Sequence, residues 1–173
     1  MTANEDWPLA ASLDSDRLHL EPLTVEHADE MVVVLDDPDL HVFIGGQPAT
    51  REELRARYEQ LVLGRSRDGS ERWLNWVIRR RDDGRPVGTV QATVTEQDLT
   101  LTAEIAWVIG TGQQRQGFAR EAALAMVACL REHGVTTIVA HVHPQHEASE
   151  AVARALGLAP TDALVDGEVR WER

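Results

Sequence analysis

The sequence QQRQGFAR, at residues 113–120, lies between two apolar runs and decides the fold. The run before it, AEIAWVI at residues 103–109, favours a β-strand, and residues 121–132 are rich in Ala, Leu and Met and favour a helix. The first turn of a helix has unpaired N–H groups and a positive dipole end, so a strand, a glycine-containing turn and a helix start together form an anion site. Gly117 and Ala119 leave the backbone open to a pyrophosphate. Side-chain donors around the same point come from Gln114, Arg115 and Arg120.

Hydrophobic periodicity predicts alternating strands and helices on both sides of this loop. Helices are expected at residues 24–35, 51–65 and 116–133, and in a later segment whose apolar face holds Ala148, Ala151, Val152, Ala155 and Leu156. Strands are expected at residues 17–23, 73–80, 86–95, 99–109 and 136–142, with a final hairpin turned at residues 165–168. The run 136–142 is β-branched and apolar, which predicts a buried strand parallel to its neighbour across a helix. This order predicts one mixed α/β domain.

Composition limits the class of protein and its partners. The 173 residues are 43% hydrophobic and 27% charged, as in a globular protein. Seventeen Lys plus Arg against 29 Asp plus Glu give a net charge of −12, which disfavours nucleic acid and anionic membranes and favours cationic partners. The single Cys129 excludes an internal disulfide and a multi-cysteine zinc site. We expect residues 1–15 to be a flexible leader, residues 16–173 to be the domain, and the cytoplasm to be the compartment.

Three features together resemble a known family. The spacing Gln114-x-x-Gly117-x-Ala119 follows a strand with Glu104 and precedes the segment HEAS at residues 146–149. From about Asp16 to the end the chain resembles the GNAT superfamily of N-acetyltransferases, and it is most similar to the branch of ribosomal-protein N-terminal (alanine) acetyltransferases. The resemblance implies an α/β (α+β) fold with a mixed, mostly antiparallel sheet of about seven strands and helices on both faces.

The resemblance also implies acetyl-CoA as the acyl donor and a set of residues that contact it. The strand end carrying Trp107, Val108 and Ile109 would separate from the strand after the helix and meet the pantetheine arm, with the Val108 N–H as the leading oxyanion donor. His146 stands where the family has Asn. The residues expected to bind the cofactor are Trp107, Val108, Ile109, Gln114, Arg115, Gln116, Gly117, Phe118, Ala119, Arg120, His146 and Ser149.

Two residues are candidates for proton transfer. Glu104 occupies the position of a catalytic glutamate in several family members, and we expect partial burial to suit it to act as a base near neutral pH. Ser149 would protonate or hydrogen-bond the departing thiolate. Alternatively, Glu104 is a strand-edge glutamate that is solvated or paired with an arginine, and the amine loses its proton to bulk water. Ser149 alternatively satisfies an N–H in the first turn of its helix.

The sequence indicates the residues that bind the amine acceptor less specifically. By position in the resembling fold, Phe43, Ile44, Gly45 and Gly46 would line the amine pocket together with the helix from residue 51. We expect a cationic primary amine, either a small molecule or a peptide or protein N-terminus, and a monomer or homodimer. His141, His143 and His146 could be a zinc site, but without cysteine or carboxylate support they are better explained as polar strand residues, so no metal is expected.

Two other functions fit parts of the pattern. A non-catalytic acyl-CoA-binding domain would keep the loop at residues 114–119 and have no need of Glu104 or Ser149. A nucleotide-phosphate binder is disfavoured, because the sequence has neither glycine-rich pattern of the common nucleotide-binding folds.

Overall fold

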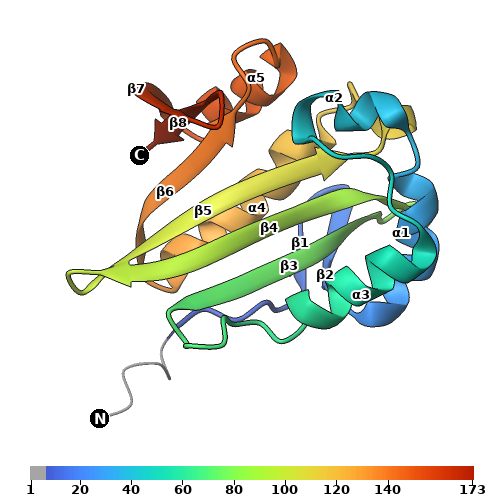
Figure 1. The fold of residues 1–173 in the computed structure, drawn as a ribbon, viewed down its shortest axis with the longest axis horizontal. Helices are drawn as coiled ribbons and strands as arrows, with labels where there is room; N and C mark the ends of the chain where they lie inside the picture. The colour runs from blue at the N-terminus through green and yellow to red at the C-terminus, as the bar shows by residue number, and fades with distance from the viewer. Residues whose placement is uncertain (1–6) are drawn as a thin grey trace.

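A computed structural model describes residues 7–173, and their eight strands form one sheet in the order β1-β2-β3-β4-β5-β6-β8-β7 (Figure 1). Neighbouring strands are antiparallel except β5 and β6, which are parallel. The predicted mixed, mostly antiparallel sheet is confirmed, with one strand more than the seven expected. The strands are β1 (Leu13–Asp14), β2 (Leu18–Pro22), β3 (Glu71–Arg80), β4 (Pro86–Gln97), β5 (Thr100–Ile109), β6 (Val135–Val142), β7 (Ala159–Val165) and β8 (Glu168–Glu172).

Helices cover both faces of the sheet, as predicted (Figure 1). Alternation along β3 shows the two layers: Trp76 and Ile78 are buried in the larger core with α4, and Val77 is buried in a smaller core with α1 and α3. No helix within residues 7–173 is both long and apolar enough to cross a membrane. The helices are α1 (Ala28–Val34), α2 (His41–Ile44), α3 (Arg51–Leu61), α4 (Phe118–Glu132) and α5 (Glu147–Ala155), with 3₁₀ turns at Val25–His27, Pro38–Leu40 and Thr111–Gln113.

The N-terminal segment differs from the flexible leader expected at residues 1–15. Residues 1–6 lie outside the described part of the chain, but Trp7 and Leu13 pack against the larger core. Trp76 Nε1 donates a hydrogen bond to Ala11 O at 2.8 Å, and β1 pairs with β2. The extra strand is only two residues long, so it has no alternation that a sequence pattern could reveal.

Three helix predictions needed correction. The first helix begins as a 3₁₀ turn, and α3 ends at Leu61 instead of residue 65. The apolar face expected for α5 is also shifted, because Ala148 and Ala151 are exposed while Ala153 and Leu156 are buried. A helix as short and rich in alanine as α5 has several faces of similar hydrophobicity, so packing against β6 and α4 selects one of them.

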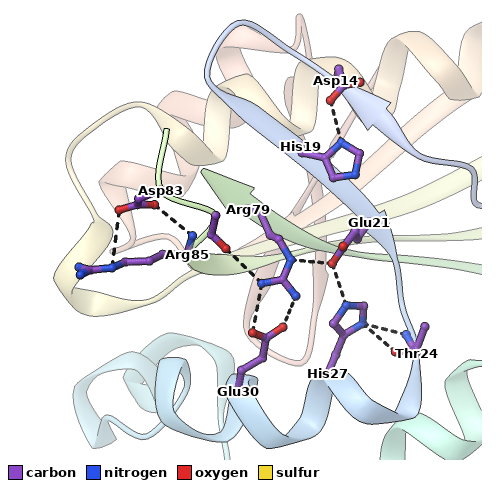
Figure 2. A network of polar contacts seen from close by, with 10 residues as sticks. Asp14, His19, Glu21, Thr24, His27, Glu30, Arg79, Asp83 and Arg85 are labelled. Carbon is purple, nitrogen blue, oxygen red and sulfur yellow. Dashed lines mark hydrogen bonds and ion pairs between the residues drawn. The ribbon is translucent and has the colours of Figure 1, made fainter. Parts of the chain in front are cut away.

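A network of polar contacts joins β2, β3 and α1 at one end of the sheet (Figure 2). Arg79 on β3 donates from Nε to Glu21 Oε2 at 2.6 Å and from its other nitrogens to Glu30 on α1. His27 Nδ1 accepts the Thr24 N–H at 2.9 Å, so the ring proton is on Nε2, which donates to Glu21 at 2.9 Å. Glu21 therefore accepts two donors that hold the start of α1 against the sheet.

Stability should depend on pH through this network. Burial raises the pKa of the Glu21 carboxyl, but the hydrogen bonds from Arg79 and His27 outweigh burial and place the pKa below its ordinary 4.5. A lowered folded-state pKa gives stability that is present above the unfolded value and is lost as pH falls through the folded value. The free energy of unfolding, measured by urea titration, should therefore fall as the pH drops below about 4.5.

Glu21→Gln should be less stable than the parent near neutral pH, and the difference should shrink as the pH falls through the lowered folded-state pKa of Glu21, where the parent carboxyl also becomes neutral. Glu59→Gln, an exposed change on α3, is the matched control and should follow the parent throughout. A constant difference between Glu21→Gln and the parent at every pH would show that the charge of Glu21 contributes nothing.

Candidate active site

The site begins where β5 and β6 separate (Figure 1). Their parallel register runs from Leu101–Val135 to Glu104–Val139 and ends there. Beyond that point β6 continues to Val142, paired on its other side with β8, and β5 continues to Ile109, paired on its other side with β4. The two strands thus present open edges to each other, as the resemblance implied.

The register with β4 decides where the N–H of Val108 points. Gly110 N donates to Val87 O at 2.8 Å, and in an antiparallel ladder every second residue bonds the same neighbour. Val108, opposite Thr89, therefore directs its backbone groups toward β4. In agreement, a Cβ added to Gly88 would lie 2.0 Å from Val108 O. The predicted Val108 oxyanion donor is thus corrected, because its N–H faces away from the open edge.

Backbone direction alternates along a strand, so Trp107 and Ile109, on either side of Val108, direct their N–H groups toward the open edge. The Gln114 side chain supports this assignment, since its Nε2 donates to Ile109 O from that side at 3.0 Å. These two N–H groups are the backbone donors that this edge offers to an incoming carbonyl oxygen.

Two cavities meet at the open edge of β5. We name them the strand cavity, of about 310 Å³, and the loop cavity, of about 430 Å³. The strand cavity includes Glu104, His141 and Glu168, whereas the loop cavity reaches the start of α4. A group bound in one cavity can therefore contact a group bound in the other. The residues that line both are Phe43, Ile44, Trp107, Val108, His146 and Ser149.

The loop before α4 has the geometry of an anion site. Gly117, the N-cap of α4, has φ +81°, a left-handed conformation that glycine adopts without strain. Arg115 also has a positive φ, +63°, which the loop imposes on a residue that disfavours it. Of the predicted cofactor residues in this loop, Gln114, Arg115, Gly117, Phe118 and Ala119 line the loop cavity. The exposed residues Gln116 and Arg120 do not.

Arg17 holds this loop in place, a role that the sequence did not indicate. Its NH1 donates to Gln116 O at 2.8 Å, and its guanidinium lies over the Phe118 ring at 4.7 Å. Glu121 in the first turn of α4 accepts both Arg17 Nε at 2.7 Å and Arg17 N at 2.8 Å. These contacts span about a hundred residues of sequence, so no local pattern could have revealed them.

Glu104 lies in the strand cavity, but its expected partial burial is wrong, because 62% of its side chain is exposed. Even-numbered residues of β5 point away from the larger core, so a carboxylate at this position faces solvent. Its partner is not an arginine: Glu104 Oε1 lies 3.2 Å from His141 Nδ1 on β6. The sequence had offered His141 as a polar strand residue or as a zinc ligand, and not as a partner of Glu104.

Ser149 and His146 lie at the start of α5, where the two cavities meet. The Ser149 hydroxyl makes no hydrogen bond within residues 7–173, so the alternative role of satisfying an N–H is not seen. The His146 ring stacks on Phe43, with centroids 4.2 Å apart and planes 7° apart. Burial, together with the neighbouring His143, lowers the pKa of His146. A neutral His146 therefore links α2 to α5 across the junction.

The predicted acceptor residues are only partly brought together. Phe43 and Ile44 line both cavities, whereas Gly45, Gly46 and the whole of α3 line neither. Glu168, which begins β8, lines the strand cavity and was missed, because nothing in its local sequence separates it from a turn residue. Within the described residues, His141, His143 and His146 form no group suited to a metal ion.

Solved structures with the same fold include three informative relatives. The ribosomal alpha-N-protein acetyltransferase RimL in complex with coenzyme A is 18% identical, with a TM-score of 0.78 over 94% of this chain and 97% of its own. A putative ribosomal-protein-serine acetyltransferase from Vibrio cholerae is 22% identical, with a TM-score of 0.71 over 94% and 97%. The microcin self-immunity acetyltransferase MccE in complex with acetyl-CoA and AMP is 13% identical, with a TM-score of 0.74 over 92% and 93%.

Sequence comparison agrees with the fold. No curated protein matches the chain. A family model described as the acetyltransferase (GNAT) domain matches residues 17–159, which include the open edge, the anion loop and the start of α5. The chain therefore belongs to the GNAT acetyltransferase family.

Proposed function

We propose that this protein transfers the acetyl group of acetyl-CoA to a primary amine of a small molecule or of a peptide or protein N-terminus. The observation that carries the proposal is the meeting of two cavities at the open edge of β5, with an anion loop in one and a carboxylate in the other. RimL, which acetylates a ribosomal protein, supports a peptide N-terminus as one candidate acceptor.

The residues of the loop cavity fit coenzyme A. The open N–H groups at the start of α4 and the nearby Arg115 suit a pyrophosphate. The unpaired backbone edge at Trp107 and Ile109 suits an amide-containing arm, which could pair with it as a strand would. When bound, acetyl-CoA supplies the thioester that the amine attacks.

The protein contributes a base, oxyanion donors and a hydroxyl. Glu104 takes a proton from the ammonium group, so that the neutral amine can attack. The N–H groups of Trp107 and Ile109 stabilise the negative oxygen that forms during attack. The free hydroxyl of Ser149, at the junction of the cavities, donates to the departing sulfur.

The charges in the strand cavity favour a cationic acceptor. Its lining includes Glu104 and Glu168 but no Lys or Arg. Glu168 is half-buried, and its carboxylate has no hydrogen-bond or ion-pair partner within residues 7–173. A cation in the cavity would compensate this carboxylate, as paired charges do elsewhere in proteins.

The first prediction concerns the anion loop. Gly117→Val should weaken coenzyme A binding about tenfold or more in isothermal titration calorimetry, because a β-branched residue is strained at φ +81° and its Cβ would lie 3.4 Å from NH2 of Arg17, which holds the loop. Gly134→Val is the matched control: it has φ +85° at the other end of α4, where a Cβ meets nothing within 4 Å. Equal affinity of Gly117→Val and the parent would remove the loop from the binding site.

The second prediction tests the base. Glu104→Gln should keep coenzyme A affinity but lower turnover near neutral pH about a hundredfold, and the deficit should shrink as pH rises because more of the amine arrives neutral. The measurement is thiol release from acetyl-CoA with the best amine of a panel. If the parent binds coenzyme A and acetylates no amine, the chain is an acyl-CoA-binding domain instead.

The third prediction tests the charge of the acceptor. Glu168→Gln should raise the KM for a cationic acceptor about tenfold and leave the KM for acetyl-CoA unchanged. Asp162→Asn on β7, exposed and outside both cavities, should match the parent. Unchanged acceptor KM in Glu168→Gln would mean that Glu168 does not contact the amine substrate.

A further inference from the structure

The contact between His141 and Glu104 is the least expected feature of the strand cavity. His141 lies on β6, and 15% of its side chain is exposed against 62% for Glu104. Nδ1 lies 3.2 Å from Glu104 Oε1, and the other ring nitrogen, Nε2, is buried without a hydrogen-bond partner among residues 7–173. The mostly buried ring of His141 thus contacts the exposed carboxylate of Glu104 in the strand cavity.

The surroundings of the ring decide which nitrogen carries the proton. A proton on Nε2 would leave a buried N–H without an acceptor and would set the lone pair of Nδ1 against a carboxylate oxygen. A proton on Nδ1 forms a charge-assisted hydrogen bond with Glu104 and leaves only a lone pair unpaired. The Nδ1–H form is therefore favoured, and His141 is a hydrogen-bond donor to Glu104.

The other charged groups around His141 do not compete for this contact. Arg170 stands opposite His141 on β8, but its Nε donates to Glu172 at 2.8 Å. His143 follows two residues later on β6 and packs against the Phe43 ring. The remaining titratable groups of the strand cavity are Glu168 on β8 and His146 at the start of α5.

We infer that His141 is a positioning residue that holds the carboxylate of Glu104 in the orientation required to deprotonate the amine, an inference that rests on the proposed function. An exposed glutamate side chain samples several rotamers, and the Nδ1–H bond restrains one carboxylate oxygen. The other oxygen is left to take the ammonium proton. That proton passes to solvent after the amine has attacked, and the hydrogen bond from His141 persists throughout.

The first arm of the test does not require activity. Nitrogen-15 NMR of the imidazole rings in the whole protein, with His141→Asn used to assign the His141 signals, reports which ring nitrogen is protonated. We expect the Nδ1–H tautomer in the parent. An Nε2–H tautomer would overturn the inference whatever the kinetics show.

The second arm is a double-mutant cycle between positions 141 and 104. His141→Phe keeps a ring but removes the donor, and kcat/KM for the amine should fall about tenfold or more while coenzyme A affinity stays unchanged. His141→Asn retains an N–H near the position of Nδ1 and should recover most of the rate. In a Glu104→Gln background, His141→Phe should cost nothing further, because the two residues act as one unit. Thermal unfolding of each variant checks that the fold is kept.

The separate kinetic constants distinguish positioning from a structural role. Loss of the restraint on Glu104 should lower kcat in His141→Phe but not in His141→Asn, while the KM for acetyl-CoA and the midpoint of thermal unfolding stay unchanged. Additive losses in the cycle, or an equal loss of kcat in His141→Asn, would overturn the inference while leaving Glu104 as the base. An Nδ1–H tautomer in a protein that acetylates no amine would refute the proposed function and the positioning role together, whereas the hydrogen bond would stand.

Discussion

The end of the parallel pairing at Glu104–Val139 is the constraint on which the rest of the site depends. Had the two strands continued to pair, β6 would have satisfied the N–H groups of Trp107 and Ile109, and no open edge would remain. Because β5 stays paired with β4 and β6 stays paired with β8, β5 and β6 can separate without fraying. The cost of unpaired backbone at this edge is the physical reason to expect a ligand that pairs with it.

The position of Glu104 follows from the same constraint. It is the last residue of β5 in register with β6, and its side chain lies on the face of the sheet opposite the larger core. The strands have not yet diverged there, so His141, two residues beyond Val139, is still within hydrogen-bond distance. A few residues further along, the same two strands line the cavity. The separation of β5 and β6 therefore places the carboxylate of Glu104, bonded to His141, at the end of the strand cavity where the two strands still pair.

Local arrangement outweighs net charge at the anion loop. The chain has a net charge of −12, yet the start of α4 offers unpaired N–H groups and is flanked by Arg17 and Arg115. Arg17 is itself restrained by Glu121, so it acts on the loop mainly by fixing its backbone. An acidic surface is thus compatible with an anion site, because helix dipoles and short-range donors act within a few ångströms while the surface charge is screened by salt.

The sequence by itself determined the elements whose signals are local: the strand before the loop, the turn at Gly117, α4, and the hairpin turned at Asp166 and Gly167. By resemblance it also named Ser149, Phe43 and Ile44, which line both cavities. Only the tertiary structure decided which backbone groups of β5 face the open edge, that β1 completes the sheet, and that Glu104 meets a histidine. The open edge depends on the register of β4 and β5, β1 on a pairing of two residues that leaves no pattern, and the Glu104–His141 contact on residues 37 positions apart, and alternation and spacing within one segment specify none of these.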